Sequence, residues 1–254
     1  MSQSIIDRLR AAGCVFAEDE ARLLISAAGT PAELADMVER RAAGLPLEHV
    51  VGWAEFFGLR IAVDPGVFVP RRRTEFLVRR AIALASPDSV VVDLCCGSGA
   101  LGAALSASVP GAELYATDID PAAVRCARRN VPRVYQGDLF EPLPAALRGR
   151  VGILLANVPY VPSGAVALLP PEARDYEPRT ALDGGDDGLD VLRRVAAEAV
   201  SWLAPGGHLL TETSEDQAPL AVEVLTRQGL RADVASSDEA TVVTGRRRSA
   251  VDQR

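Results

Sequence analysis

The sequence predicts an α/β fold in which helices cover both faces of a doubly wound, mostly parallel sheet. From about residue 75 onward, short apolar runs alternate with segments of helical periodicity, which is the pattern of repeated βα units. Runs rich in Val, Leu and Ile are typical of strands that are buried on both faces. The 254 residues suffice for one large domain with a small additional region.

The first part of the chain, residues 1–50, is expected to form a short helical region. Thr30, Pro31 and Glu33 together predict a helix start. The threonine oxygen can accept a backbone N–H, proline fits the first helical position, and a glutamate at the third position completes a capping box. Gly44 is expected to end this helix.

Residues 51–72 are expected to form a β-hairpin that links the helical region to the main domain. Two apolar runs, WAEFFGLRIAV and VFVP, lie on either side of the turn sequence Asp64-Pro65-Gly66. The main domain is expected over residues 73–254.

The elements of the main domain follow one another in βα order. Strands are expected at 89–94, 112–119, 133–138, 151–156, 206–213, 230–235 and 240–245. Helices are expected at 100–108, from Asp120-Pro121 onward, near 188–203 and near 216–228.

Composition excludes several classes of protein. The sequence contains no lysine, which rules out a Walker P-loop, a Schiff base and a Tyr-Lys dehydrogenase pair. A net charge of −7 speaks against broad nucleic-acid binding. No apolar run reaches the length of a membrane span, and the N-terminus has no signal-peptide pattern. The four cysteines lack zinc-ligand spacing, so we expect a reduced, cytoplasmic protein with no metal site.

A glycine-rich loop over residues 97–102 matches the pattern G-x-G-x-x-G between a predicted strand and a predicted helix. Asp118 follows at about the distance expected of an acid that binds ribose hydroxyls. Three interpretations fit this pattern: a dinucleotide site, an S-adenosyl-L-methionine site, or a tight turn whose glycines serve packing alone.

Two features favour S-adenosylmethionine. Asp93 ends the strand before the glycines, where a carboxylate can face a cationic methionine group but would repel a pyrophosphate. Asp138 and Leu139 follow the third strand, where an acid or a backbone amide can meet an adenine edge.

The tetrad Asn157-Val158-Pro159-Tyr160 follows the fourth strand, at the edge of the sheet where ligands of open α/β folds bind. A planar NH2 group is a weak nucleophile because its lone pair is delocalised. The Asn157 side-chain oxygen and the Val158 carbonyl could hold its two hydrogens and turn the nitrogen toward a methyl group. Pro159 would fix the turn and Tyr160 would lie against the planar group. The alternative is an ordinary Asn-x-Pro turn.

These segments together resemble the protein-(glutamine-N(5)) methyltransferases that modify peptide-chain release factors. The resemblance runs from about residue 44 to the C-terminus, through GLPLEHVVGWAEFFGL, VFVPRRRTEFLV, VVDLCCGSGAL, TDIDPAAV, GDLF, NVPY, YEPRTALDGGDDGLD and GGHLLTET. It implies a class I S-adenosylmethionine-dependent methyltransferase fold: a seven-stranded, mostly parallel sheet with a C-terminal antiparallel hairpin. The region 1–50 would then bind the protein substrate and 73–254 would be the catalytic domain.

The resemblance also implies roles for individual residues. The methionine part of the cofactor would contact Cys95, Cys96, Gly97, Ser98 and Gly99. Asp118 would bind the ribose, and Leu139 would lie beside the adenine. Asn157 to Tyr160 would hold the glutamine of the Gly-Gly-Gln loop of a release factor.

Two further residues are candidates for substrate binding. Glu177 lies in a segment that resembles the family's loop near the substrate pocket, and its alternative role is a rigid turn. Arg71 begins the run Arg71–Arg73, which we expect to be either a solvated surface or a contact with an acidic partner or RNA.

The sequence departs from the family pattern at several positions. Val158 replaces a proline, but its backbone carbonyl survives, so we expect the acceptor to remain on a less rigid turn. Cys95 replaces the first loop glycine and narrows the space there. Arg72 and Arg73 replace a proline and an acid, and the N-terminal helical region is short for the family.

Other functions stay open from the sequence. The tetrad suits an exocyclic amine of a nucleic acid or small molecule equally well, although the net acidity counts against a nucleic-acid ligand. An NAD-linked oxidoreductase is opposed by Asp93 and by the absence of lysine. A relative that binds the cofactor without catalysis is compatible with the changes at Val158 and Cys95.

Overall fold

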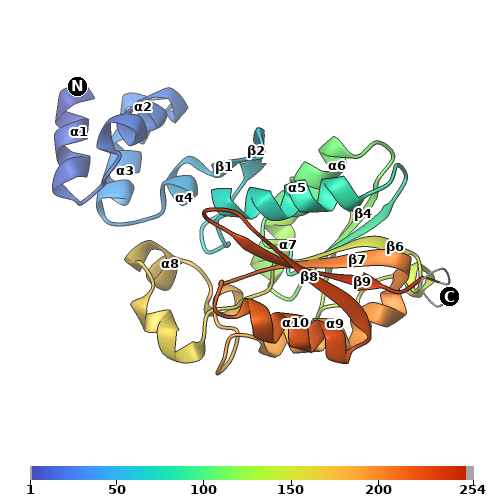
Figure 1. Cartoon of the computed structure of the whole chain (residues 1–254). Helices are drawn as coiled ribbons and strands as arrows, with labels where there is room; N and C mark the ends of the chain where they lie inside the picture. Colours follow the sequence, from blue (N-terminus) through green and yellow to red (C-terminus); the bar gives the residue numbers. More distant parts are fainter. Residues whose placement is uncertain (1, 250–254) are drawn as a thin grey trace.

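The computed structural model describes residues 2–249 and contains an α/β domain built on a seven-stranded sheet (Figure 1). The strand order is β5-β4-β3-β6-β7-β9-β8; the first five pair in parallel, and β9 pairs antiparallel with both β7 and β8. The strands are β3 (Val90–Leu94), β4 (Glu113–Asp118), β5 (Val134–Gln136), β6 (Val151–Ala156), β7 (Leu203–Thr213), β8 (Leu230–Ser236) and β9 (Thr241–Arg247). The predicted fold class is confirmed. Residues 250–254, at the end of the expected catalytic domain, lie outside the described residues.

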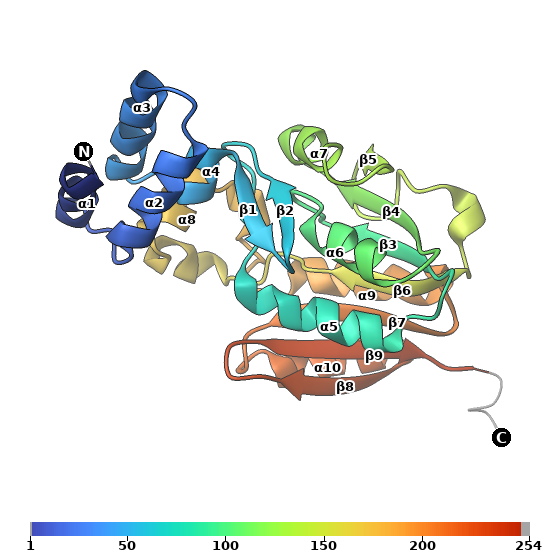
Figure 2. The same cartoon turned by 90° about the horizontal axis from the view of Figure 1, so that it is seen from above.

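Helices cover both faces of the sheet (Figures 1 and 2). One layer contains α5 (Glu75–Leu84), α6 (Ala100–Ser108) and α7 (Pro121–Ala127); the other contains α9 (Asp190–Trp202) and α10 (Ala218–Arg227). Adjacent residues of one strand belong to different layers, because Val91 packs with the first and Val92 with the second. This two-sided burial explains why the strands of the sheet are nearly continuous apolar runs.

The N-terminal region consists of α1 (Ser2–Ala11), α2 (Ala17–Ala27), α3 (Pro31–Ala42) and α4 (Leu47–Val51), which form their own small apolar core. The predicted start of α3 is confirmed: the Thr30 side chain accepts a hydrogen bond of 3.2 Å from the Glu33 N–H. No helix between residues 2 and 249 is both long enough and apolar enough to span a bilayer.

A β-hairpin follows, but its turn is not where the sequence predicted it. Strands β1 (Trp53–Phe56) and β2 (Leu59–Ala62) are joined by Phe57-Gly58 rather than by Asp64-Pro65-Gly66. Phe57 and Gly58 have φ values of 53° and 72°. Two consecutive positive φ values form the tight turn that matches the twist of an antiparallel pair. The Asp-Pro-Gly turn follows β2, and the segment after it continues to the cavity described below.

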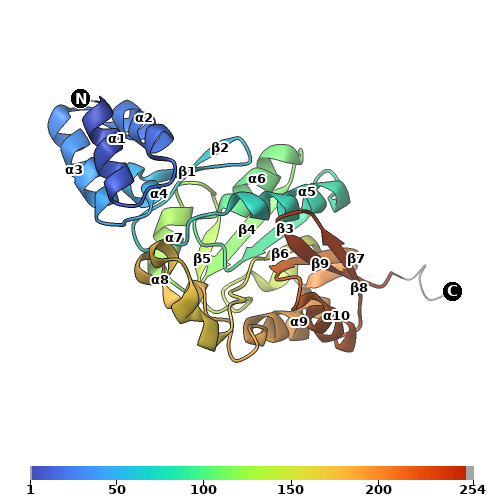
Figure 3. The ribbon, with the colours of Figure 1, turned by 60° about the vertical axis from the view of Figure 1, so that its left-hand side comes forward.

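The segment between β6 and α9 carries short helices that the sequence did not predict. These are η3 (Ser163–Leu168), α8 (Pro171–Tyr176) and η4 (Arg179–Ala181); η1 (Arg72–Thr74) and η2 (Ala145–Leu147) lie elsewhere in the chain. Helix α8 lies beside the N-terminal helices (Figure 3). Arg41 of α3 bonds to Glu20 at 2.6 Å and to Glu172 of α8 at 2.6 Å, and the Tyr176 hydroxyl donates to the Ala43 carbonyl.

Candidate functional site

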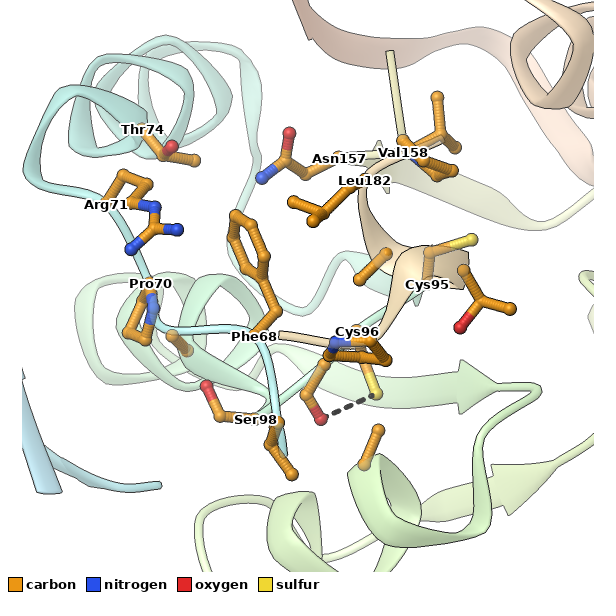
Figure 4. A pocket seen from close by; sticks show the side chains of 18 of the residues that line it. Phe68, Pro70, Arg71, Thr74, Cys95, Cys96, Ser98, Asn157, Val158 and Leu182 are labelled. Carbon is orange, nitrogen blue, oxygen red and sulfur yellow. Dashed lines mark hydrogen bonds between the residues drawn. The ribbon is translucent and has the colours of Figure 1, made fainter. Parts of the chain in front are cut away.

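A cavity of about 450 Å³ opens at the carboxyl ends of β3, β4 and β6 (Figure 4). The loops after these three strands form one wall, the segment 67–74 forms another, and residues 169–182 form a third. Ligands of open α/β sheets bind at this edge, and the size lies within the range of small-molecule sites. Among residues 2–249, no cluster of His, Cys, Asp or Glu is arranged to hold a metal ion.

The loop after β3 brings backbone close to the cavity. Cys95, Gly97 and Gly99 all have positive φ, at 53°, 55° and 79°. A Cβ atom on Gly97 would meet only the Phe68 Cβ atom, at 3.9 Å, so space remains beside this glycine for a ligand. Cys95 adopts a backbone conformation that costs a non-glycine residue about 1–2 kcal/mol. The loop is therefore held in this shape by its surroundings.

The two cysteines of this loop are packing groups. Cys95 packs against one apolar core and Cys96 is buried in the other. Burial raises the pKa of both thiols, which keeps them protonated and poorly nucleophilic at neutral pH.

Asp118 fixes the glycine loop to the end of β4. Its Oδ2 accepts a hydrogen bond of 2.8 Å from the Gly97 N–H, and its Oδ1 accepts one of 2.9 Å from the Asp120 N–H. Burial raises the pKa of this carboxyl despite both bonds. Asp118, Ile119 and Asp120 all line the cavity, so a carboxylate that can still accept a hydrogen bond from a ligand lies at the end of β4.

Asp93 lies at the end of β3 and is 1% exposed. Its Oδ2 accepts a hydrogen bond of 2.9 Å from the Gly102 N–H in the first turn of α6. Burial raises the pKa of Asp93 to about 7. The group therefore lines the cavity while it supports the helix, and a nearby positive charge would favour its ionised form.

Four residues selected from the sequence do not line the cavity: Gly99, Asp138, Leu139 and Glu177. Asp138 pairs with Arg194 of α9 at 2.5 Å. Leu139 is buried in the core, and its carbonyl accepts from the Thr117 hydroxyl. Gly99 is the residue before α6, where a Cβ atom would lie 3.1 Å from a Val131 methyl group.

Arg71 and Arg73 of the predicted arginine run each bond to a buried carboxylate, although the Arg73 side chain is 44% exposed. Arg71 donates to the buried Glu177 carboxylate at 2.5 Å, and its guanidinium lies 4.8 Å from the centre of the Phe68 ring. Glu177 also accepts from the Val69 N–H at 3.1 Å. A buried carboxylate is costly unless it is paired and hydrogen-bonded, and the Arg71 guanidinium and the Val69 N–H supply these contacts. Glu177 thus fixes the segment that presents Phe68 to the cavity.

The tetrad at the end of β6 lies in the cavity lining, as the sequence placed it. Oδ1 of Asn157 is shielded from solvent and has no hydrogen-bond partner among the described residues. Tyr160 is anchored at both ends: its hydroxyl donates to Oε1 of Glu212 at 2.9 Å and accepts from Arg73 at 2.9 Å, and its carbonyl accepts from Gln217. Burial and the Glu212 charge raise the pKa of Tyr160 to about 12.

The sequence did not single out three residues that line the cavity: Phe68, Thr74 and Glu212. Glu212 is 3% exposed and comes from the end of β7, where it lies between Thr211 and Thr213 after two leucines. A charged residue in such a buried strand is the signal that could have identified it.

The cavity has the properties that S-adenosylmethionine requires. This cofactor carries positive charge on its sulfur and its amino group, and the carboxyl groups of Asp93 and Asp118 line the cavity. The open space beside Gly97 lets a ligand approach the backbone.

Comparison with known proteins agrees with this geometry. Residues 58–151 match the family described as the Methyltransferase small domain. A release factor glutamine methyltransferase of Mycolicibacterium smegmatis is 39% identical over 232 residues, which cover 88% of this chain and 82% of the relative. The chain belongs to the release factor glutamine methyltransferase family. As a member of this family it is an S-adenosylmethionine-dependent enzyme.

Two other proteins resemble this member of the family. A 4-amino-L-phenylalanine/4-methylamino-L-phenylalanine methyltransferase of Streptomyces pristinaespiralis is 39% identical over 186 residues, covering 69% of this chain and 63% of the relative. The fold resembles that of a T. thermophilus 16S rRNA N2 G1207 methyltransferase solved with AdoMet and guanosine. That match has a TM-score of 0.56 at 22% identity and covers 77% of this chain and 50% of the other.

Proposed function

We propose that this enzyme methylates the side-chain amide nitrogen of a glutamine in a protein, namely the glutamine of the Gly-Gly-Gln loop of a peptide-chain release factor. The observation that carries this proposal is the unpartnered Oδ1 of Asn157, which is buried in the cavity lining beside the glycine loop. A shielded acceptor without a partner costs about 1–3 kcal/mol, and the N–H of a bound amide would remove this cost.

Asn157 and Val158 would orient the substrate amide. When bound, S-adenosylmethionine supplies a methyl group on a positively charged sulfur. The amide nitrogen is a poor nucleophile, so its alignment rather than a strong base is the main requirement. The Asn157 oxygen and the Val158 carbonyl would accept the two amide hydrogens. The anchored Tyr160 would limit how far the tetrad can move.

The cofactor would be held by the loop residues and the two acids. Gly97 and Ser98 would receive its methionine part, Asp118 its ribose, and Asp93 would compensate its positive charge. Arg71 and Glu177 would act through the segment they fix, which presents Phe68, rather than by direct contact with the glutamine. Asp138 and Leu139 would border the adenine from behind the cavity lining.

The N-terminal helices would provide the docking surface for the release factor. They are joined to the cavity wall because Arg41 bonds to Glu172, which lines the cavity. A substrate that acts in translation would place this enzyme in the cytoplasm.

A second acceptor class is a primary aromatic amine. The Streptomyces pristinaespiralis relative is named for such a substrate, and an NH2 group could be held by the same acceptors. An exocyclic amine of a nucleic acid would need a basic surface, which a net charge of −7 does not favour.

The Asn157→Ala variant tests the proposal. We expect kcat for a purified release factor to fall at least about a hundredfold, because the amide loses its alignment. The Kd for S-adenosylmethionine should stay within about threefold. Asn157→Asp is the matched variant: it keeps an acceptor oxygen at the Oδ1 position but replaces the NH2 group and adds charge, and it should retain more activity than Ala. Wild-type kcat in Asn157→Ala would refute the role of the tetrad.

A further inference from the structure

Three shielded oxygen atoms in the cavity lining lack a hydrogen-bond partner within residues 2–249: Oδ1 of Asn157, Oε2 of Glu212 and Oγ1 of Thr74. The Thr74 and Glu212 side chains are 1% and 3% exposed. Buried polar groups are nearly always paired, so an unpaired oxygen at a cavity wall is a group to which a polar ligand can bond.

The hydroxyl of Thr74 makes no hydrogen bond with the described residues. Thr74 is the residue before α5, where a threonine normally accepts a hydrogen bond from a backbone N–H of the first turn. Its φ and ψ values of −66° and −13° are helical, and no such bond forms. Its backbone is fixed because its N–H donates to the Arg71 carbonyl at 3.0 Å. The side chain points toward Asn157 (Figure 4).

The three oxygens differ in what they can bind. As a carboxylate, Glu212 only accepts, and its Oε1 is already held by Arg73 at 3.0 Å and by Tyr160 at 2.9 Å. Asn157 Oδ1 also only accepts. The Thr74 hydroxyl is therefore the one member of this set that can donate a hydrogen.

The two candidate methyl acceptors offer different hydrogen-bonding groups to these three oxygens. A carboxamide offers two N–H donors and one carbonyl acceptor, whereas a primary aromatic amine offers N–H donors and no carbonyl. We infer that the Thr74 hydroxyl donates to the carbonyl oxygen of the acceptor and selects a carboxamide over an amine. This inference rests on the proposed function and identifies the residue that sets its substrate class.

Thr74→Val removes the hydroxyl and keeps the shape, while Thr74→Ser keeps the hydroxyl. Thr244→Val is the control, because Oγ1 of Thr244 is also buried and unpartnered among the described residues but lies on β9 outside the cavity lining. Methyl transfer would be measured with a purified release factor and with 4-amino-L-phenylalanine. Titration calorimetry with S-adenosylmethionine gives the folded, competent fraction to which each rate is normalised.

We expect Thr74→Val to lower kcat/KM for the release factor at least about tenfold, because the carbonyl loses its donor. Thr74→Ser and Thr244→Val should stay within about threefold. The preference for the release factor over the aromatic amine should fall in Thr74→Val alone.

Three results would overturn the inference, each for a different reason. A Thr74→Val enzyme with wild-type kcat/KM for the release factor, while the wild type methylates it, overturns the role of Thr74 and leaves the proposed function intact. A wild-type enzyme that methylates the amine and not the release factor overturns both. Equal losses in Thr74→Val and Thr74→Ser, normalised to cofactor binding, also overturn it, because the hydroxyl would then not be the cause.

Discussion

The hydroxyl of Tyr160 donates a hydrogen bond of 2.9 Å to Oε1 of Glu212, and this contact joins the tetrad after β6 to the neighbouring strand β7. Arg73 bonds to the same two groups, at 2.9 Å to the hydroxyl and 3.0 Å to the carboxylate. A hydroxyl, a carboxylate and a guanidinium thus satisfy one another at the cavity wall. Arg73 is therefore paired within the protein at this wall of the cavity.

Tyr160→Phe should remove this anchor without changing the ring. We expect kcat for the release factor to fall about tenfold, because the tetrad becomes mobile and Glu212 loses a donor. The Kd for S-adenosylmethionine should change less than about threefold. Tyr135→Phe, on β5 and outside the cavity lining, is the matched control. An unchanged kcat in Tyr160→Phe would contradict the role of the anchor.

Asp93 should make the stability of the protein depend on pH. Its pKa is raised by burial from 3.8 to about 7, so the folded state binds the proton more tightly than the unfolded state. Its contribution to the free energy of unfolding is therefore fully present below about pH 4 and is lost as the pH rises through about 7.

Asp93→Asn removes this titration while keeping an oxygen for the Gly102 N–H. At pH 8 we expect the variant to be more stable than the wild type by on the order of 1–3 kcal/mol, with the difference shrinking toward pH 5. Urea unfolding at pH 5, 6, 7 and 8 measures the free energy of unfolding of the wild type and of the variant. If the stability difference between the variant and the wild type were constant across this pH range, the raised pKa of Asp93 would be contradicted.

The ion pairs of Arg41 should be unequal in their contribution to stability. Glu20 and Arg41 are almost fully buried, with side chains 10% and 8% exposed, whereas Glu172 is 49% exposed. Arg41→Ala leaves Glu20 buried without its cation and should cost about 3–5 kcal/mol. Glu172→Ala leaves Arg41 paired with Glu20 and should cost about 1 kcal/mol or less.

A further variant, Glu172→Gln, tests whether the N-terminal helices help to shape the cavity. We expect Glu172→Gln to raise KM for the release factor more than it lowers kcat, because it loosens the contact between α8 and α3. The free energies would come from urea unfolding and the kinetic constants from methyl transfer. Equal destabilisation by Arg41→Ala and Glu172→Ala would show that burial does not control these pairs.

Much of the fold could be predicted from the sequence because its signals are local. The buried strands are continuous apolar runs, Thr30 and Asp120 cap the helices expected after them, and α6 matches its predicted range. The predicted position of the hairpin turn was wrong because Asp-Pro-Gly is a stronger local turn signal than Phe-Gly. The pairing of β1 with β2 places the turn at Phe57-Gly58.

The site was predicted only where its residues follow a strand directly. Asn157 directly follows β6 and Asp118 ends β4 at the ligand-binding edge of the sheet, so their positions follow from the topology. Glu212 meets Tyr160 across 52 residues, and Arg71 meets Glu177 across 106. Separations this long match no helical or strand periodicity, so these contacts can be found only from the tertiary structure.

The reaction proposed for this enzyme is methylation of the glutamine of the Gly-Gly-Gln loop of a release factor. The most direct measurement is mass spectrometry of the release factor of its host after incubation with the purified enzyme and S-adenosylmethionine, with Asn157→Ala as the control. We predict one methyl group on that glutamine, and none with the variant. An unmodified glutamine, obtained with wild-type enzyme that binds the cofactor, would contradict the claim.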